Sequence, residues 1–177
     1  MKQPLWTKDF LLFIGSNFFV SMNFYLLATT MAMYAMDQFE HHTNSAGVGC
    51  VIYYEQNGKN YRLRKNAQLD SLLSNNEAEY AALHFCLTEL EWLDIHHMEV
   101  RFLGDSQVVI HQMAGEWPVY EPQFATWAER IDKKLEALHI TPQYELIGRK
   151  QNTEADRLAT QALEGLDIYE HGEAAYN

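Results

Sequence analysis

Three carboxylates stand where local patterns predict that a strand ends or a helix begins. Asp105 lies just after the predicted strand 99–103, and Glu79 lies in the first turn of a helix predicted after Asn76. Asp156 lies in the first turn of a later predicted helix. Such element ends meet at one edge of an α/β sheet, so side chains far apart in the chain can converge there. Hard divalent cations prefer oxygen ligands, and the three acids therefore predict a metal site.

Each of these acids also has a simpler interpretation when it is taken singly. A carboxylate in the first turn of a helix interacts favourably with the helix dipole and is commonly solvated. The metal-site prediction therefore depends on the three acids together and on the elements that position them.

The elements follow from patterning and turn residues. The apolar run 47–54, the dipeptide Asn57-Gly58 and the alternating segment 59–65 predict a β-hairpin. Ser74 and Glu77 have the spacing of a capping box at a helix start. The remaining predicted elements are a helix over 78–93, a strand over 99–103, helices over 106–113 and 124–138, a strand over 143–147 and a helix over 153–163. This order predicts an α/β fold with a mixed sheet and helices on its faces.

The segments around the acids have a recognisable order. They read Asn75-Asn76-Glu77-Ala78-Glu79-Tyr80-Ala81-Ala82, then Gly104-Asp105-Ser106-Gln107, then Arg149-Lys150-Gln151-Asn152-Thr153-Glu154-Ala155-Asp156-Arg157-Leu158-Ala159. Over about residues 46–163 the chain resembles the ribonuclease H type 1 family, and more narrowly its bacterial reverse transcriptase-like branch.

The resemblance implies a ribonuclease H-like fold, a five-stranded mixed sheet with helices on both faces. It implies an active site of four acids, of which Glu79, Asp105 and Asp156 would be three, holding two Mg²⁺ or Mn²⁺ ions. Such ions would serve phosphodiester hydrolysis in the RNA strand of an RNA–DNA hybrid. Contacts to the hybrid or another nucleic acid would come from Asn75, Asn76, Ser106, Gln107, Arg149 and Asn152. Of these, Asn76 would lie near the minor groove, where 2′-hydroxyls distinguish RNA from DNA.

The fourth acid is where the sequence departs from the family. The family carries Asp on its first strand at a spacing that falls here on Met36, and the nearest carboxylate is Asp37. A shift of one residue turns a strand side chain to the opposite face unless a bulge or a shortened loop compensates. Asp37 is therefore the candidate fourth catalytic and metal-binding acid. The alternative is a catalytically impaired nucleic-acid-binding module that keeps the fold.

The N-terminus differs from the rest of the chain. Residues 10–36 carry no charged side chain and are long enough to span a membrane. The first 39 residues look like the first transmembrane segment of a major-facilitator transporter. We divide the chain into an apolar segment over 1–28, which would form a helix, a ribonuclease H-like domain over 29–165 whose first strand falls in 29–37, and an acidic tail over 166–177. Export makes little sense for a hybrid-cleaving enzyme. We therefore expect a cytoplasmic monomer, with membrane association as the alternative if 10–36 inserts.

Composition narrows the choice further. The 177 residues include only two cysteines, which excludes a disulfide scaffold. Their net charge of −11 excludes a protein that binds nucleic acid through overall positive charge. The basic substrate-binding insertion of the family is absent between Met113 and Phe124. Trp117 and Tyr120 stand there instead, in a segment that could stack on a ligand or pack on the core.

Overall fold

The structure is a computed structural model, and it describes residues 45–70 and 73–174. The chain divides into two compact units, Met1–His42 and Thr43–Asn177, and the second unit is described below. Several predictions lie outside the described residues: the apolar segment 1–28, the transporter likeness, the first strand within 29–37, and the alternatives Met36 and Asp37. Within the described ranges, no helix is long and apolar enough to cross a membrane.

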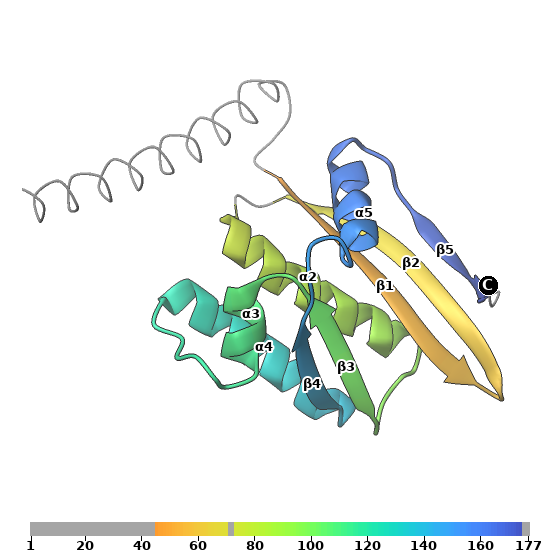
Figure 1. Ribbon diagram of the computed structural model, residues 1–177, viewed down its shortest axis with the longest axis horizontal. Helices are drawn as coiled ribbons and strands as arrows, with labels where there is room; N and C mark the ends of the chain where they lie inside the picture. The colour runs from red at the N-terminus through yellow and green to blue at the C-terminus, as the bar shows by residue number, and fades with distance from the viewer. Residues whose placement is uncertain (1–44, 71–72, 175–177) are drawn as a thin grey trace, which may run out of the picture. The chain divides into compact units, whose positions relative to one another are not determined.

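The predicted hairpin is confirmed and is longer than expected. Strand β1 (Ala46–Gln56) pairs antiparallel with β2 (Lys59–Leu69). The turn uses Asn57 and Gly58 at φ values of 54° and 72°, the left-handed region that this dipeptide tolerates. Figure 1 shows the two strands as a long twisted ribbon.

Part of the segment 166–177, expected to be an acidic tail, forms a strand. Residues Tyr169–Glu173 form strand β5, which pairs antiparallel with β2 and gives a three-stranded sheet in the order β1-β2-β5. Ion pairs of Arg64 with Glu170 and of Lys59 with Glu173 join the two strands. These partners lie more than a hundred residues apart in the chain, so local composition does not reveal the strand.

The other two described strands form a separate sheet. Strand β3 (Glu99–Gly104) pairs parallel with β4 (Thr141–Leu146). The described residues thus hold a mixed α/β fold, as predicted, but in sheets of three and two strands instead of one sheet of five.

Four helices occur in the described residues. They are α2 (Asn75–Trp92), α3 (Gln107–Met113), α4 (Pro122–Leu138) and α5 (Thr153–Leu163). Ser74 caps α2 in the predicted capping box, because its hydroxyl accepts from Glu77 N–H while the Glu77 carboxylate accepts from Ser74 N–H. The core packs between the sheets and helices α2 and α4 around Leu63, Tyr80, Leu87 and Ile131, each fully buried or nearly so.

Helix α5 lies against the opposite face of β1 (Figure 1). Two glycines of β1 make this approach possible. A Cβ atom at Gly47 would lie 2.1 Å from the carbonyl oxygen of Ala159, and one at Gly49 would lie 2.6 Å from that of Ala155. Helix α5 is therefore seated directly on the backbone of β1, and this contact fixes the helix that carries Asp156.

Candidate active site

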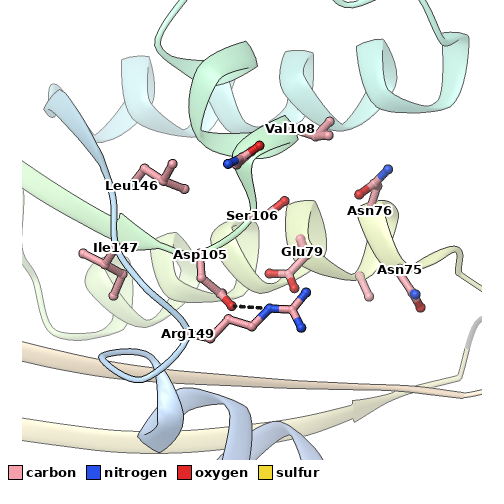
Figure 2. A pocket seen from close by; sticks show the side chains of 11 residues that line it. Asn75, Asn76, Glu79, Asp105, Ser106, Val108, Leu146, Ile147 and Arg149 are labelled. Atoms are coloured by element: carbon pink, nitrogen blue, oxygen red, sulfur yellow. Dashed lines mark ion pairs between the residues drawn. The ribbon is translucent and has the colours of Figure 1, made fainter. Parts of the chain in front are cut away.

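The three acids are placed by three different elements. Glu79 lies on the first turns of α2, Asp105 directly follows β3, and Asp156 lies in the first turn of α5. Figure 2 shows the side chains of Glu79 and Asp105 pointing toward each other across the mouth of a pocket. The side chain of Asp105 is only 12% exposed, so its carboxylate lies largely out of solvent.

The pocket has a volume of about 730 Å³ and opens where helices α2 and α3 begin. It includes most of the nucleic-acid contacts predicted from sequence. Its lining comprises Asn75, Asn76, Ala78, Glu79, Asp105, Ser106, Gln107, Val108, Leu146, Ile147 and Arg149.

Asn152 connects two of the acids. It is the residue from which α5 starts, and its side-chain amide donates to Asp105 Oδ1 at 2.7 Å and to Asp156 Oδ1 at 3.2 Å. The position of the amide is set by the preceding turn, in which Gln151 N–H donates to Gly148 O while Gly148 N–H donates to Gln151 Oε1. Sequence reasoning assigned Asn152 to nucleic-acid binding and did not foresee this bridge.

Arg149 supplies positive charge at the mouth of the pocket. Its Nε lies 3.9 Å from Asp105 Oδ2, and its side chain is 93% exposed (Figure 2). So exposed a pair adds little to stability. The guanidinium is therefore free to exchange the carboxylate for a phosphate group, with which it can form paired hydrogen bonds.

The acids influence each other's protonation. Burial, and then the charges of Asp105 and Asp156, raise the pKa of Glu79, although the Arg149 guanidinium opposes the shift. Burial and the charge of Asp105 likewise raise the pKa of Asp156. Crowded carboxylates that resist ionisation mark a place where a cation would be bound favourably.

The donor set suits a hard divalent cation, because every candidate ligand is a carboxylate oxygen. Within the parts of the chain that the structure describes, however, no three His, Cys, Asp or Glu side chains are close enough together to hold a metal ion. Asp105 and Asp156 each accept a hydrogen bond from the Asn152 side-chain amide. The predicted fourth ligand, Asp37, lies outside the described residues.

Two features in or beside the candidate site were missed from the sequence. Leu146 and Ile147, at the end of β4, give the wall opposite α2 an apolar surface (Figure 2). Tyr80, which directly follows Glu79, donates a hydrogen bond from its hydroxyl to Gln112 Oε1 at 2.7 Å. No motif indicates this bond, because it joins α2 to the far end of α3.

Comparisons with known proteins agree with this fold. The sequence profile described as reverse transcriptase-like matches residues 35–162. The uncharacterized protein YpeP of Bacillus subtilis is 41% identical over 141 residues, which cover 80% of this chain and 62% of YpeP. The chain thus spans less than two thirds of the length of the curated relatives that it matches.

Two solved structures share the fold. The RNase H1 of the halophilic archaeon Halobacterium salinarum superposes with a TM-score of 0.53 at 22% identity, over 69% of this chain and 97% of that one. LC11-RNase H1 in complex with an RNA/DNA hybrid superposes with a TM-score of 0.53 at 22% identity, over 68% and 94% of the two chains. The chain belongs to the reverse transcriptase-like family and has a ribonuclease H-like fold.

Proposed function

We propose that the protein is a metal-dependent endonuclease that cleaves the RNA strand of RNA–DNA hybrids. The observation that carries the proposal is that Glu79 and Asp105, from two separate elements, line one open pocket, while the Asn152 amide links Asp105 to Asp156 on a third element. A carboxylate cluster beside exposed amides and one arginine suits a phosphodiester whose charge is balanced by divalent cations. The solved relative bound to an RNA/DNA hybrid supports this choice of substrate.

Roles for the individual residues follow from their places. Asp105, Glu79 and Asp156 would hold Mg²⁺ or Mn²⁺, and Asp37 would complete the set; two such ions would supply an activated water and stabilise the leaving oxygen. Asn75 and Asn76, at the first turn of α2, offer amide donors to the sugar and base edges of the minor groove. Ser106, Gln107 and Arg149 face the same pocket and would hold the backbone. Asn152 keeps Asp105 and Asp156 oriented.

The domain assignment forms part of the proposal. The family match begins at residue 35, so it includes Asp37 and falls within the domain proposed over 29–165. We place the protein in the cytoplasm, since hybrids arise where nucleic acids are copied. We also propose that it is a monomer. Insertion of residues 10–36 into a membrane is the alternative.

A cleavage assay tests the proposal. The full-length protein with Mg²⁺ or Mn²⁺ should cut a fluorescent RNA–DNA hybrid in the RNA strand and leave a DNA–DNA duplex intact. Asp105→Asn should lower kcat about a thousandfold or more, because the variant loses a ligand charge at the centre of the site. The matched control is Asp94→Asn, whose side chain is 93% exposed and lies outside the pocket; it should cleave like the wild type. Absence of cleavage by the folded wild-type protein would refute the proposal.

The second candidate is a binding module that has lost catalysis. It is favoured by Met36 at the family's first acidic position and by the lack of a three-ligand cluster among the described side chains. Under this alternative the wild type binds the hybrid without cutting it, and Met36→Asp gains cleavage. Under the main proposal the wild type cleaves, and Asp37→Asn abolishes cleavage.

A further inference from the structure

The face of β2 that meets α5 carries charged and polar side chains. Residues 62, 64 and 66 alternate onto this face of the strand, where the sequence has Arg, Arg and Asn. The side chain of Arg64 is 13% exposed and Asn66 is 2% exposed, and groups so far out of water need polar partners. Those partners lie on α5, which packs over β1 and β2, and on β5, which runs along the edge of β2 (Figure 1).

Asn66 joins β2 to α5 and to the segment that leads into β5. Its amide donates to Leu158 O at 2.8 Å and to Leu166 O at 3.0 Å. Its Oδ1 accepts from Ile168 N–H at 2.7 Å. The chain that leaves α5 is thus held against β2 directly before β5 begins.

Arg64 connects β5 with the first turn of α5. Its Nη1 donates to Glu170 Oε2 of β5 at 2.5 Å, and its Nε forms an ion pair with Glu154 Oε1 of α5 at 2.7 Å. Arg62 donates to the same Glu154 oxygen. The hydrogen bond to Glu170 raises the pKa of Arg64, so the guanidinium stays charged. One arginine of β2 therefore bridges a carboxylate of α5 and a carboxylate of β5.

Glu154 lies two residues before Asp156 in the first turn of α5. At 3.6 residues per turn, two residues are separated by about 200° around the helix axis, so the two carboxylates point to opposite sides. Glu154 meets the arginines of β2, while Asp156 accepts from the side-chain amide of Asn152. Contacts on both sides thus fix the rotation of this turn, and loss of the contacts to β2 would leave it held on one side.

A simpler role for Glu154 is stability alone, since an acid in the first turn of a helix interacts favourably with the helix dipole. That role does not account for the use of a third element. The family match ends at residue 162, and β5 lies beyond it, yet β5 supplies the hydrogen bond that holds Arg64. The contacts therefore join a strand outside the matched region to the helix turn that carries Asp156.

We propose that Arg64 and Glu154 are positioning residues for Asp156, and that β5 holds Arg64 in place through Glu170. The inference rests on the proposed function, because it concerns how that same site is kept ready for divalent cations. It extends the nuclease beyond the family match to residue 173.

The first test combines hybrid cleavage with Mg²⁺ binding by the full-length protein. Arg64→Gln and Glu154→Gln should each lower kcat about tenfold and leave KM for the hybrid within about twofold, because displacement of Asp156 affects the reacting phosphate and not the rest of the substrate. Calorimetric titration without substrate should show Mg²⁺ binding weakened about fivefold in both. Arg64→Lys should recover only part of kcat, since an ammonium lacks the planar fork that reaches two carboxylates.

The direction of the change in Mg²⁺ affinity separates positioning from plain electrostatics. Arg64→Gln removes a positive charge and Glu154→Gln removes a negative one. Charge alone would therefore strengthen Mg²⁺ binding in the first variant and weaken it in the second. Loss of positioning weakens it in both.

Two glutamates of β5 provide a matched control. Glu170 and Glu173 have side chains that are 60% and 59% exposed, and each pairs with a cation of β2. The partner of Glu170 is Arg64, which also contacts α5, whereas the partner of Glu173 is Lys59, at the other end of β2. Glu170→Gln should lower kcat about threefold, and Glu173→Gln should leave it unchanged.

A second readout needs neither metal nor substrate. The side-chain amide of Asn152, which donates to Asp105 and Asp156, gives its own signals in a two-dimensional proton–nitrogen NMR spectrum. These signals should shift in Arg64→Gln and keep their positions in Glu173→Gln.

The outcomes separate the two proposals. If the wild type cleaves, and Arg64→Gln and Glu154→Gln match Glu173→Gln in kcat, Mg²⁺ affinity and the Asn152 signals, the positioning role is wrong and the proposed function stands. Opposite changes of Mg²⁺ affinity in the two variants would also overturn the role. If the folded wild type neither binds nor cleaves the hybrid, the proposed function fails and the positioning role fails with it. All assays run well below the lowest melting temperature of the set, and the exposed change Glu170→Gln decides the matter if the other variants do not fold.

Discussion

At the scale of single residues, a carboxylate that lines the pocket lowers the stability of the fold, whereas a nearby carboxylate outside the pocket raises it. Two neighbouring glutamates on α2 show the contrast. The pKa of Glu77 is lowered, first because the Ser74 hydroxyl donates to its carboxylate, whereas burial and the nearby acids raise the pKa of Glu79. Glu77 therefore stabilises the fold when it is ionised, and Glu79 destabilises it.

We predict opposite effects of two matched substitutions on the stability of the protein in a metal chelator. Because the folded-state pKa of Glu79 lies above 4.5, the folded protein binds more protons than the unfolded chain in the window just above that value. The free energy of unfolding then falls as pH rises through the window, and the loss persists at neutral pH. Glu79→Gln should raise the melting temperature at pH 7.

Glu77→Gln should lower the melting temperature at pH 7, because a lowered pKa gives stability that is present above 4.5 and lost as pH falls through the folded-state value. Both differences should shrink as pH falls below 4.5, because the carboxyls then become protonated in the unfolded state and progressively in the folded state. Thermal melts followed by circular dichroism across this range make the check. A fall in melting temperature for Glu79→Gln at pH 7 would contradict the assignment.

The sequence indicated the acids but not their support. The motifs and their order were enough to propose Glu79, Asp105 and Asp156 as candidate site residues. The bridging amide of Asn152 depends on the hydrogen bonds of the turn over 148–152, and the Tyr80–Gln112 bond depends on how two helices pack. Neither is a property of a short window, so local patterning could not have predicted them.

At the scale of elements, the close packing of α5 on β1 determines where Asp156 lies. Gly49 meets the carbonyl oxygen of Ala155 and the Cβ of Leu158, each at 2.6 Å from a built Cβ position. An added methyl group would have to push the helix away from the strand, and helix α5 carries Asp156.

We predict that Gly49→Ala lowers the free energy of unfolding by about 1–3 kcal/mol through overpacking, and that it lowers kcat as well. Gly172→Ala on β5 is the control. A Cβ there meets nothing within 4 Å, so stability should change by less than about 0.5 kcal/mol. Urea unfolding and hybrid cleavage measure the two effects. An active Gly49→Ala protein of unchanged stability would show that α5 has room to adjust.

Element prediction succeeded where a local signal existed. The hairpin had its Asn57-Gly58 turn, and α2 had its capping box, and both formed as predicted. Strand β5 has no apolar alternation and is exposed throughout, so only its pairing with β2 defines it. The burial of the charged residue Glu89 was missed for the same reason. Glu89 on α2 is 3% exposed, and Lys65 of β2 donates hydrogen bonds to both its carboxylate oxygens at 2.8 Å.

At the scale of the whole molecule, the proposed nuclease domain begins before the first described residue. The family match begins at residue 35, ten residues before the first described residue. The family resemblance assigns a strand and an acid to this interval. The apolar segment over 1–28 lies outside the match.

We predict that a chain beginning at residue 29 keeps the kcat of the full-length protein within about twofold. A chain beginning at residue 45 should lose cleavage by about a thousandfold or more, because it lacks Asp37 and the proposed first strand. Asp37→Asn in the full-length chain distinguishes loss of the acid from loss of the strand, since it should abolish cleavage at nearly unchanged melting temperature. Full activity of the chain that begins at 45 would refute the domain proposal.

The position of β5 at the outer side of its sheet has a consequence for how molecules behave in concentrated solution. An outer strand exposes unpaired backbone groups that can recruit the same strand of a neighbouring molecule. Here Glu170 and Glu173 line that strand, and two such strands brought together would set carboxylates against each other. In the described part of the sheet, residues that look like a solvated acidic end would thus oppose edge-to-edge aggregation.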